Sequence, residues 1–198
     1  MKKILIFCIC ICFLGGANAQ KPSIAGHRNF PVILSLRFHS ISMPFKNLGS
    51  NFSNVGIGLG TEVSYNGRQN WVQQFMISWQ RNAPAGNSLL LSTQTVWRSD
   101  FVDNFFTEFK AGIGYSYSFR PVPSYKQENG KWVAAGHRGK GMLAIPLGVG
   151  AGYNKYSNNT YFSPFAGYQL VLLKNYSKSI PLVPETVIEA GTRIHFKK

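Results

Sequence analysis

From residue 30 to residue 196 the chain alternates apolar and polar positions with a period of two, and no helical period persists. This pattern is typical of β-strands, because successive side chains point to opposite faces of a sheet. It predicts eight strands, at 30–41, 54–65, 71–81, 88–98, 104–119, 142–153, 160–172 and 185–196. Soluble strands usually have about five or six residues, whereas a strand that crosses a membrane needs about nine to eleven. The predicted strands therefore have the length of membrane strands.

The two faces of these strands differ in an informative way. In the second strand, Ile57 and Leu59 alternate with Gly56, Gly58 and Gly60. Glycine on a face exposed to water gains no packing and costs conformational entropy, whereas inside a narrow barrel it leaves room for large polar side chains. The pattern favours a barrel whose apolar side chains face lipid. A soluble periplasmic lipid-binding barrel, with its apolar face inward, is an alternative.

Aromatic residues on the apolar face gather at strand ends that share one rim of an up-and-down barrel. They are Tyr65, Trp71, Trp97, Phe105, Tyr153, Phe162 and Phe196, with Phe38, Trp79 and Phe119 as a thinner set on the other rim. Aromatic girdles of this kind mark the two boundaries between lipid and water.

Loop lengths predict which rim of the barrel faces the outside of the cell. The connections 42–53, 120–141 and 173–184 are long and share one rim with the short 82–87, whereas 66–70, 99–103 and 154–159 are short and share the other. Outer-membrane barrels have short periplasmic turns and longer external loops, so the long loops are predicted to be external.

The N-terminus has the three parts of an export signal. Lys2 and Lys3 are followed by an apolar stretch at 4–14 and by the cleavage pattern Ala17-Asn18-Ala19. We expect residues 1–19 to be a cleaved signal peptide and residues 20–198 to be one barrel domain. All three cysteines lie in the apolar stretch, so the mature chain would contain no thiol.

With its export signal, eight alternating strands and aromatic rim, the chain resembles the small eight-stranded outer-membrane β-barrels of Gram-negative envelopes. The resemblance covers residues 30–196 and implies an all-β, antiparallel, up-and-down transmembrane barrel in the outer membrane. Two features depart from such barrels. Lys197 and Lys198 follow the last aromatic residue, and Pro146 and Pro164 fall inside predicted strands, where they remove ladder donors and could mark bulges.

The polar face of the strands predicts a charged network inside the barrel. Its expected members are Arg37, Glu62, Arg98, Glu108, Lys110, Glu189 and Arg193, accompanied by the polar residues His39, Gln74, Gln94 and His195. Buried charges require partners, so we expect ion pairs that fill a lumen too narrow for an open channel. A proton or ion path through the same groups is the alternative.

His39 suggests a second alternative, a lipid-A-modifying acyl hydrolase or transferase. Ser40 and Ser42 are close to it in sequence, but Ser40 has the lipid-facing parity and no orienting carboxylate is evident at that level. The other histidine of the barrel face, His195, is expected near the opposite rim. We therefore expect no catalytic residues, and the dispersed histidines indicate no metal site.

The chain has 21 Lys and Arg against 7 Asp and Glu, a net charge of +14, which favours anionic partners. Five basic residues fall in or beside the long 120–141 loop: Arg120, Lys126, Lys131, Arg138 and Lys140. On an external loop their expected partners are lipopolysaccharide and membrane lipid, and nucleic acid is not expected. The sequence thus predicts a monomeric outer-membrane barrel without a cofactor, with a structural or surface-interaction role such as adhesion.

Overall fold

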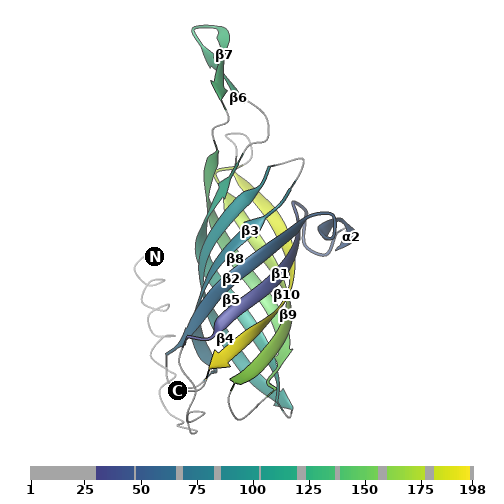
Figure 1. The fold of residues 1–198 in the computed structure, drawn as a ribbon. Helices are drawn as coiled ribbons and strands as arrows, with labels where there is room; N and C mark the ends of the chain where they lie inside the picture. Colours follow the sequence, from purple (N-terminus) through teal and green to yellow (C-terminus); the bar gives the residue numbers. More distant parts are fainter. Residues whose placement is uncertain are drawn as a thin grey trace, which may run out of the picture.

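The computed structural model describes residues 30–46, 48–65, 69–82, 86–102, 104–119, 124–136, 139–155, 160–176 and 181–196. Eight of its strands form a closed antiparallel barrel in the order β1-β10-β9-β8-β5-β4-β3-β2 (Figure 1). Their bounds are Val32–Ser40 (β1), Val55–Ser64 (β2), Trp71–Gln80 (β3), Ser88–Val102 (β4), Phe105–Ser118 (β5), Lys140–Tyr153 (β8), Thr160–Lys174 (β9) and Leu182–Phe196 (β10). The eight predicted strands are confirmed, although β4 continues past its expected end at residue 98.

Closure of the barrel depends on the first and last strands. β1 pairs with β10 from Val32 opposite Ile194 to Ser40 opposite Thr186. Closure leaves no barrel strand with an unpaired edge, which is a requirement for a sheet surrounded by lipid. No helix among the described residues is both long and apolar enough to cross a membrane.

Neither Pro146 nor Pro164 marks a β-bulge, which the sequence had left open. Pro146 pairs with Val171 of β9, and the ladder between β5 and β8 keeps one register on both sides of it. Pro164 pairs with Thr192 of β10 and lies just beyond the ladder between β8 and β9. Each proline therefore stays in its strand without a register shift.

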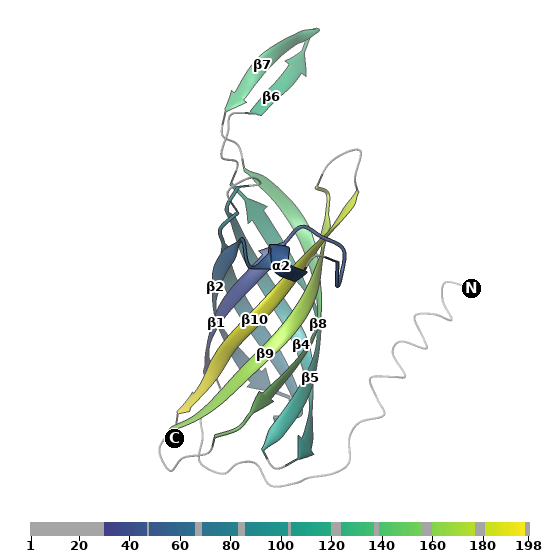
Figure 2. The ribbon, with the colours of Figure 1, turned by 90° about the vertical axis from the view of Figure 1, so that its right-hand side faces the viewer.

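The long connection predicted at 120–141 contains two strands that the sequence pattern did not predict. Within it, β6 (Ser124–Glu128) and β7 (Lys131–Gly136) form a two-stranded hairpin that projects beyond the barrel (Figures 1 and 2). Asn129 and Gly130 join the strands with positive φ angles of 51° and 78°. Asn-Gly favours the tight turns that need two positive φ angles, so this dipeptide was the signal for the hairpin. We call the barrel end that carries it the hairpin rim, and the end where β1 begins and β10 ends the terminal rim.

The outer wall of the barrel is apolar. Ile57, Leu59, Ile77 and Ile113 are about half exposed, with exposed fractions of 63, 54, 52 and 53%. Polar and charged side chains of the same strands are buried on the lumen side. This arrangement has the apolar face outward, opposite to that of a soluble lipid-binding barrel.

Aromatic side chains line both rims on the outer wall. At the terminal rim Trp97 stacks on Phe109, and Phe105 packs against Tyr153 with ring centroids 4.8 Å apart. At the hairpin rim Trp79 packs on Phe119 at 5.6 Å. The apolar wall thus lies between two aromatic girdles, as in membrane barrels.

Leu59→Arg tests the lipid-facing assignment of the outer wall. We expect the substitution to lower the free energy of unfolding in phosphatidylcholine liposomes by about 2–4 kcal/mol, because a cation on the lipid face must be desolvated. Urea unfolding measures the loss, with Trp132→Arg on the projecting hairpin as the control. Unchanged stability of Leu59→Arg would show that this wall does not face lipid.

Candidate functional site

The seven charged residues predicted for the lumen all have buried side chains on the inner face of the barrel. Arg37 comes from β1, Glu62 from β2, Arg98 from β4, Glu108 and Lys110 from β5, and Glu189 and Arg193 from β10. Each is at most 6% exposed. Charges this deeply buried are stable only when opposite charges lie beside them.

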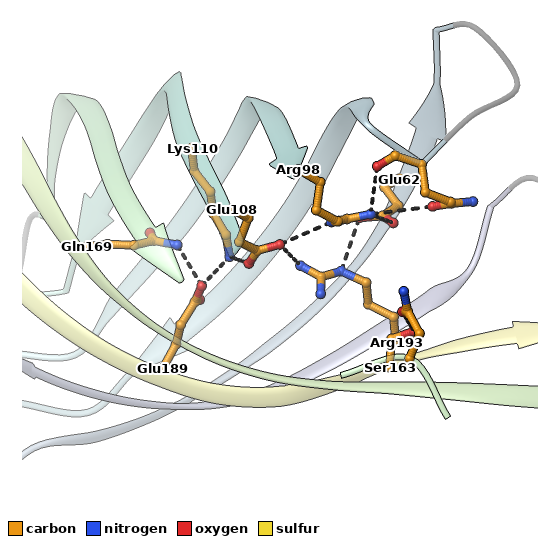
Figure 3. Close-up of polar contacts among 10 residues, drawn as sticks. Glu62, Arg98, Glu108, Lys110, Ser163, Gln169, Glu189 and Arg193 are labelled. Atoms are coloured by element: carbon orange, nitrogen blue, oxygen red, sulfur yellow. Dashed lines mark hydrogen bonds and ion pairs between the residues drawn. The ribbon is translucent and has the colours of Figure 1, made fainter. Parts of the chain in front are cut away.

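Two arginines and two glutamates form the centre of the network (Figure 3). Arg98 binds Glu62 through both ends of its guanidinium, with Nη2 to Oε2 at 2.8 Å and Nη1 to Oε1 at 3.1 Å. Arg193 donates to Glu108 at 2.7 Å and to Glu62 at 3.2 Å, and Arg98 Nε donates to Glu108 Oε2 at 3.3 Å. Each carboxylate therefore contacts both guanidinium groups, and the four charges form a closed ring.

Lys110 extends the ring toward the hairpin rim. Its Nζ lies 2.9 Å from Glu108 Oε1 and 2.5 Å from Glu189 Oε1, so it bridges two carboxylates. Gln169 of β9 donates to the same Glu189 oxygen at 2.9 Å and accepts from Arg37 at 3.4 Å. Gln169 was not among the residues predicted from the sequence, although, like Ser163, it lies on the lumen-facing side of β9.

Glycines create the space that these side chains occupy. In the strand registers Glu108 lies opposite Gly150, Lys110 opposite Gly148, Glu189 opposite Gly167 and Arg37 opposite Gly56. A Cβ atom on Gly150 would lie 3.1 Å from Glu108 Oε1 and 3.0 Å from the Ala166 carbonyl oxygen. The glycines on the polar face of the strands thus leave space for the charged side chains opposite them.

Aromatic rings cover the cations of the network. The Arg193 guanidinium lies 4.2 Å from the centroid of Phe165, the Lys110 ammonium 4.9 Å from the same ring, and the Arg98 guanidinium 5.4 Å from Phe106. Cation–π contacts of this kind stabilise desolvated cations. Phe106 and Phe165 also belong, with Ile33 and Met76, to an apolar cluster that lies among the charged side chains.

A second apolar cluster lies on the hairpin side of the network. It comprises Leu90, Met142, Ala144, Val171, Leu173, Val183 and Val187, all of them buried. This cluster was not predicted, because residues 170–173 are apolar on both faces of β9, which hides the alternation. The charged network therefore has apolar side chains on its hairpin side and aromatic rings among its own members.

His39 has an orienting carboxylate, contrary to the expectation from the sequence. Its Nδ1 lies 2.7 Å from Glu185 Oε1, and its Nε2 lies 3.3 Å from the Arg81 carbonyl oxygen. The neighbouring serines bind elsewhere, Ser40 to the Ser50 hydroxyl and Ser42 to the Thr186 hydroxyl. Among the described residues neither Ser40 nor Ser42 is hydrogen-bonded to this ring, so they do not form the serine–histidine pair of an acyl hydrolase.

Of the five basic residues predicted for the external loop, the side chains of Lys131 and Lys140 are among the described ones. Lys131 is exposed in β7 opposite Glu128, whereas Lys140 begins β8 and donates to the Tyr176 carbonyl oxygen at 2.7 Å. Arg120 and Arg138 lie outside the described residues, as does the side chain of Lys126. In the described part of the chain no three His, Cys, Asp or Glu residues could together hold a metal ion.

Several solved structures match this chain over most of its length, two of them being Neisserial surface protein A and Ail. Neisserial surface protein A matches with a TM-score of 0.50 at 10% sequence identity, over 87% of this chain and 99% of that one. Ail, the attachment invasion locus protein of Yersinia pestis, matches with a TM-score of 0.50 at 12% identity, over 86% of this chain and 99% of that one. At these identities the likeness concerns the fold alone.

No protein-family model matches the sequence. No curated protein sequence matches it either. The solved structures are small eight-stranded outer-membrane β-barrels, and the chain has their fold. The fold class and the resemblance predicted from the sequence are confirmed, and the predicted outer-membrane location agrees with this fold.

Glu108→Ala tests whether the central ring holds the barrel together. Arg98, Lys110 and Arg193 would all lose the carboxylate that they share. We therefore expect the free energy of unfolding in liposomes to be about 3–5 kcal/mol lower than that of the wild type. Adding Arg98→Met should restore part of this loss, because one unpaired cation is removed. The exposed Glu128→Ala on the hairpin is the control. Strictly additive losses in the double variant would show that Arg98 and Glu108 do not stabilise each other.

Gly150→Ala tests the role of glycine beside the ring. The new methyl group would press on Glu108 and on the β9 backbone, and overpacking of this kind costs about 1–3 kcal/mol. Gly49→Ala is the matched control, since a Cβ atom there meets nothing within 4 Å. If both variants unfolded at the urea concentration of the wild type, the space beside Glu108 would not depend on glycine.

Proposed function

We propose that this chain is an exported outer-membrane barrel with a closed lumen, whose role is structural or adhesive and is carried by its external surface. Residues 1–19 act as the cleaved export signal in this proposal, and residues 20–198 form the barrel domain. The observation that carries it is the lumen network. Paired charges, with aromatic rings among them and an apolar cluster on their hairpin side, occupy the space that a channel would need.

The closed lumen argues against transport as the main activity. An open channel requires hydrated polar groups along its whole length, whereas here buried apolar side chains lie among the ion pairs and on their hairpin side. A proton path would also need groups free to exchange protons. Glu62 and Glu108 instead each bind two guanidinium groups, which are always charged. The network therefore suits a structural plug better than a relay.

The β6–β7 hairpin offers the surface for an external partner. Trp132 is 71% exposed and Val133 42%, with Lys131 exposed beside them. Aromatic and basic side chains together suit the sugars and phosphates of lipopolysaccharide. The two matched structures carry the names of a surface protein and an attachment protein, which is in keeping with a role of this kind.

The acyl-enzyme alternative is not favoured, because in the described residues Ser40 and Ser42 bind other hydroxyls and the His39 ring lies beside Glu185 and a backbone carbonyl. We propose that His39 is a lumen hydrogen-bonding residue near the hairpin rim. The soluble lipid-binding alternative conflicts with the half-exposed apolar wall and the buried charges. No enzymatic activity is therefore part of the proposal.

Lys131→Glu combined with Trp132→Ser tests the hairpin as the interaction surface. We expect phosphatidylcholine liposomes that carry the wild type to bind immobilised lipopolysaccharide, less so at high salt because screening weakens ionic contacts. The double variant should bind markedly less. Lys155→Glu, an equal charge reversal on an exposed residue of the terminal rim, should bind like the wild type.

The same proteins in planar bilayers test the closed lumen, since the plug predicts no steady current. A sustained wild-type current would contradict the plug. Equal loss of binding in the hairpin variant and in Lys155→Glu would show that net charge alone, and not the hairpin, binds lipopolysaccharide.

A further inference from the structure

The segment between β1 and β2 does not rise from the hairpin rim as an external loop would. Its described residues, 41–46 and 48–54, include the short helix α2 (Leu48–Asn51). In Figures 1 and 2 the segment lies outside the barrel, with α2 against the wall near β10 and below the hairpin rim. α2 contacts both β1 and β10. The segment thus folds back along the outer wall.

Hydrogen bonds hold the segment to that wall. Thr186 of β10 points outward, yet it is only 1% exposed because the segment covers it. Its hydroxyl donates to Asn51 Oδ1 at 3.2 Å and lies 2.9 Å from the Ser42 hydroxyl. Asn51 is fully buried and also donates to the Thr186 carbonyl oxygen at 3.5 Å. These polar groups are satisfied by one another on the outside of the barrel.

Aromatic contacts place the segment well below the rim. Phe45 stacks on Tyr168 of β9 with ring centroids 4.9 Å apart and an interplanar angle of 17°, and its N–H donates to the Tyr168 hydroxyl at 3.0 Å. Leu170 and Leu172 follow on the same outer face before β9 ends at Lys174. At about 3.3 Å per residue, Phe45 contacts β9 roughly 20 Å along the strand from that end. It therefore lies level with the apolar wall.

Five of the exposed side chains of the segment are large and apolar. Ile41, Met43, Phe45, Leu48 and Phe52 are exposed by 43, 60, 75, 44 and 60%. A patch of this kind facing water would be unusual, but it continues the lipid-facing wall formed by Leu170 and Leu172. Apolar side chains on a segment that lies along a membrane protein partition into the acyl region of a bilayer, as those of the barrel wall do.

We propose that the 41–54 segment is a lipid-embedded anchor, whose exposed apolar side chains contact the acyl chains of the outer leaflet beside the barrel. Lys46 is exposed next to Phe45, and a lysine at this position can extend its ammonium toward lipid phosphate groups. The anchor widens the lipid contact of β9 and β10 on one side only. It rests on the membrane insertion that the proposed function requires.

Photocrosslinking tests the anchor in the full chain. Benzoylphenylalanine replaces Phe45, Leu59 or Trp132 in separate samples in dioleoylphosphatidylcholine liposomes, and adducts are identified by mass spectrometry. We expect lipid adducts at position 45 in yield comparable with position 59 on the barrel wall, and a marked loss of yield at position 132 on the hairpin.

The pattern of adducts separates this inference from the proposed function. Lipid adducts at position 59 without adducts at position 45 would overturn the anchor alone, whereas their absence at both positions would overturn membrane insertion as well. A crosslinked dimer at position 45 would mean that a second copy of the chain, and not lipid, covers the segment.

Thr186→Val gives a second test, because it removes the hydroxyl that binds Asn51 and Ser42 but keeps the shape of the side chain. Releasing the segment should lower the adduct yield at position 45 and leave the yield at position 59 unchanged. An unchanged yield at position 45 would overturn the role of Thr186 in holding the segment against lipid.

Discussion

A charge that is removed from water must be paired, and the narrow lumen of this barrel removes several charges from water at once. The ring of Glu62, Glu108, Arg98 and Arg193 meets this requirement by giving each carboxylate two guanidinium partners. Other features of the lumen follow from the ring. Glycines opposite the charges provide room, aromatic rings cover the cations, and apolar side chains lie among the pairs and on their hairpin side.

Filling the lumen in this way moves the interactions of the molecule to its outer surfaces. The hairpin presents Trp132 and Lys131 beyond one rim, and the 41–54 segment presents Phe45 and Met43 along the wall. These two surfaces face different surroundings in the proposed arrangement, one aqueous and one lipid. The barrel between them acts as a rigid support whose inside is dedicated to stability.

The strands and the lumen members were accessible from the sequence because alternation is a local property that needs no knowledge of the fold. Pairing was less accessible, since Arg193 and Glu62 are 131 residues apart and meet only because β10 closes onto β1. The hairpin was missed although Asn129 and Gly130 mark it, and Glu185 was missed because the partner of His39 lies across the closing ladder. The folding back of the 41–54 segment depends on Thr186 and Tyr168, which no sequence period connects to it.

The closing ladder between β1 and β10 also determines the order in which the barrel can mature. Arg193 belongs to the last strand, and its partners Glu62 and Glu108 are 131 and 85 residues earlier. Before β10 pairs with β1 and β9, Glu62 and Glu108 have only Arg98 as a guanidinium partner, and the sheet has two unpaired edges. Contacts between such distant residues form late, because the chain must lose much of its conformational freedom before they can stabilise it. Barrel closure and the pairing of Glu62 and Glu108 with their second guanidinium group therefore both require β10, and a chain truncated before β10 would lack both.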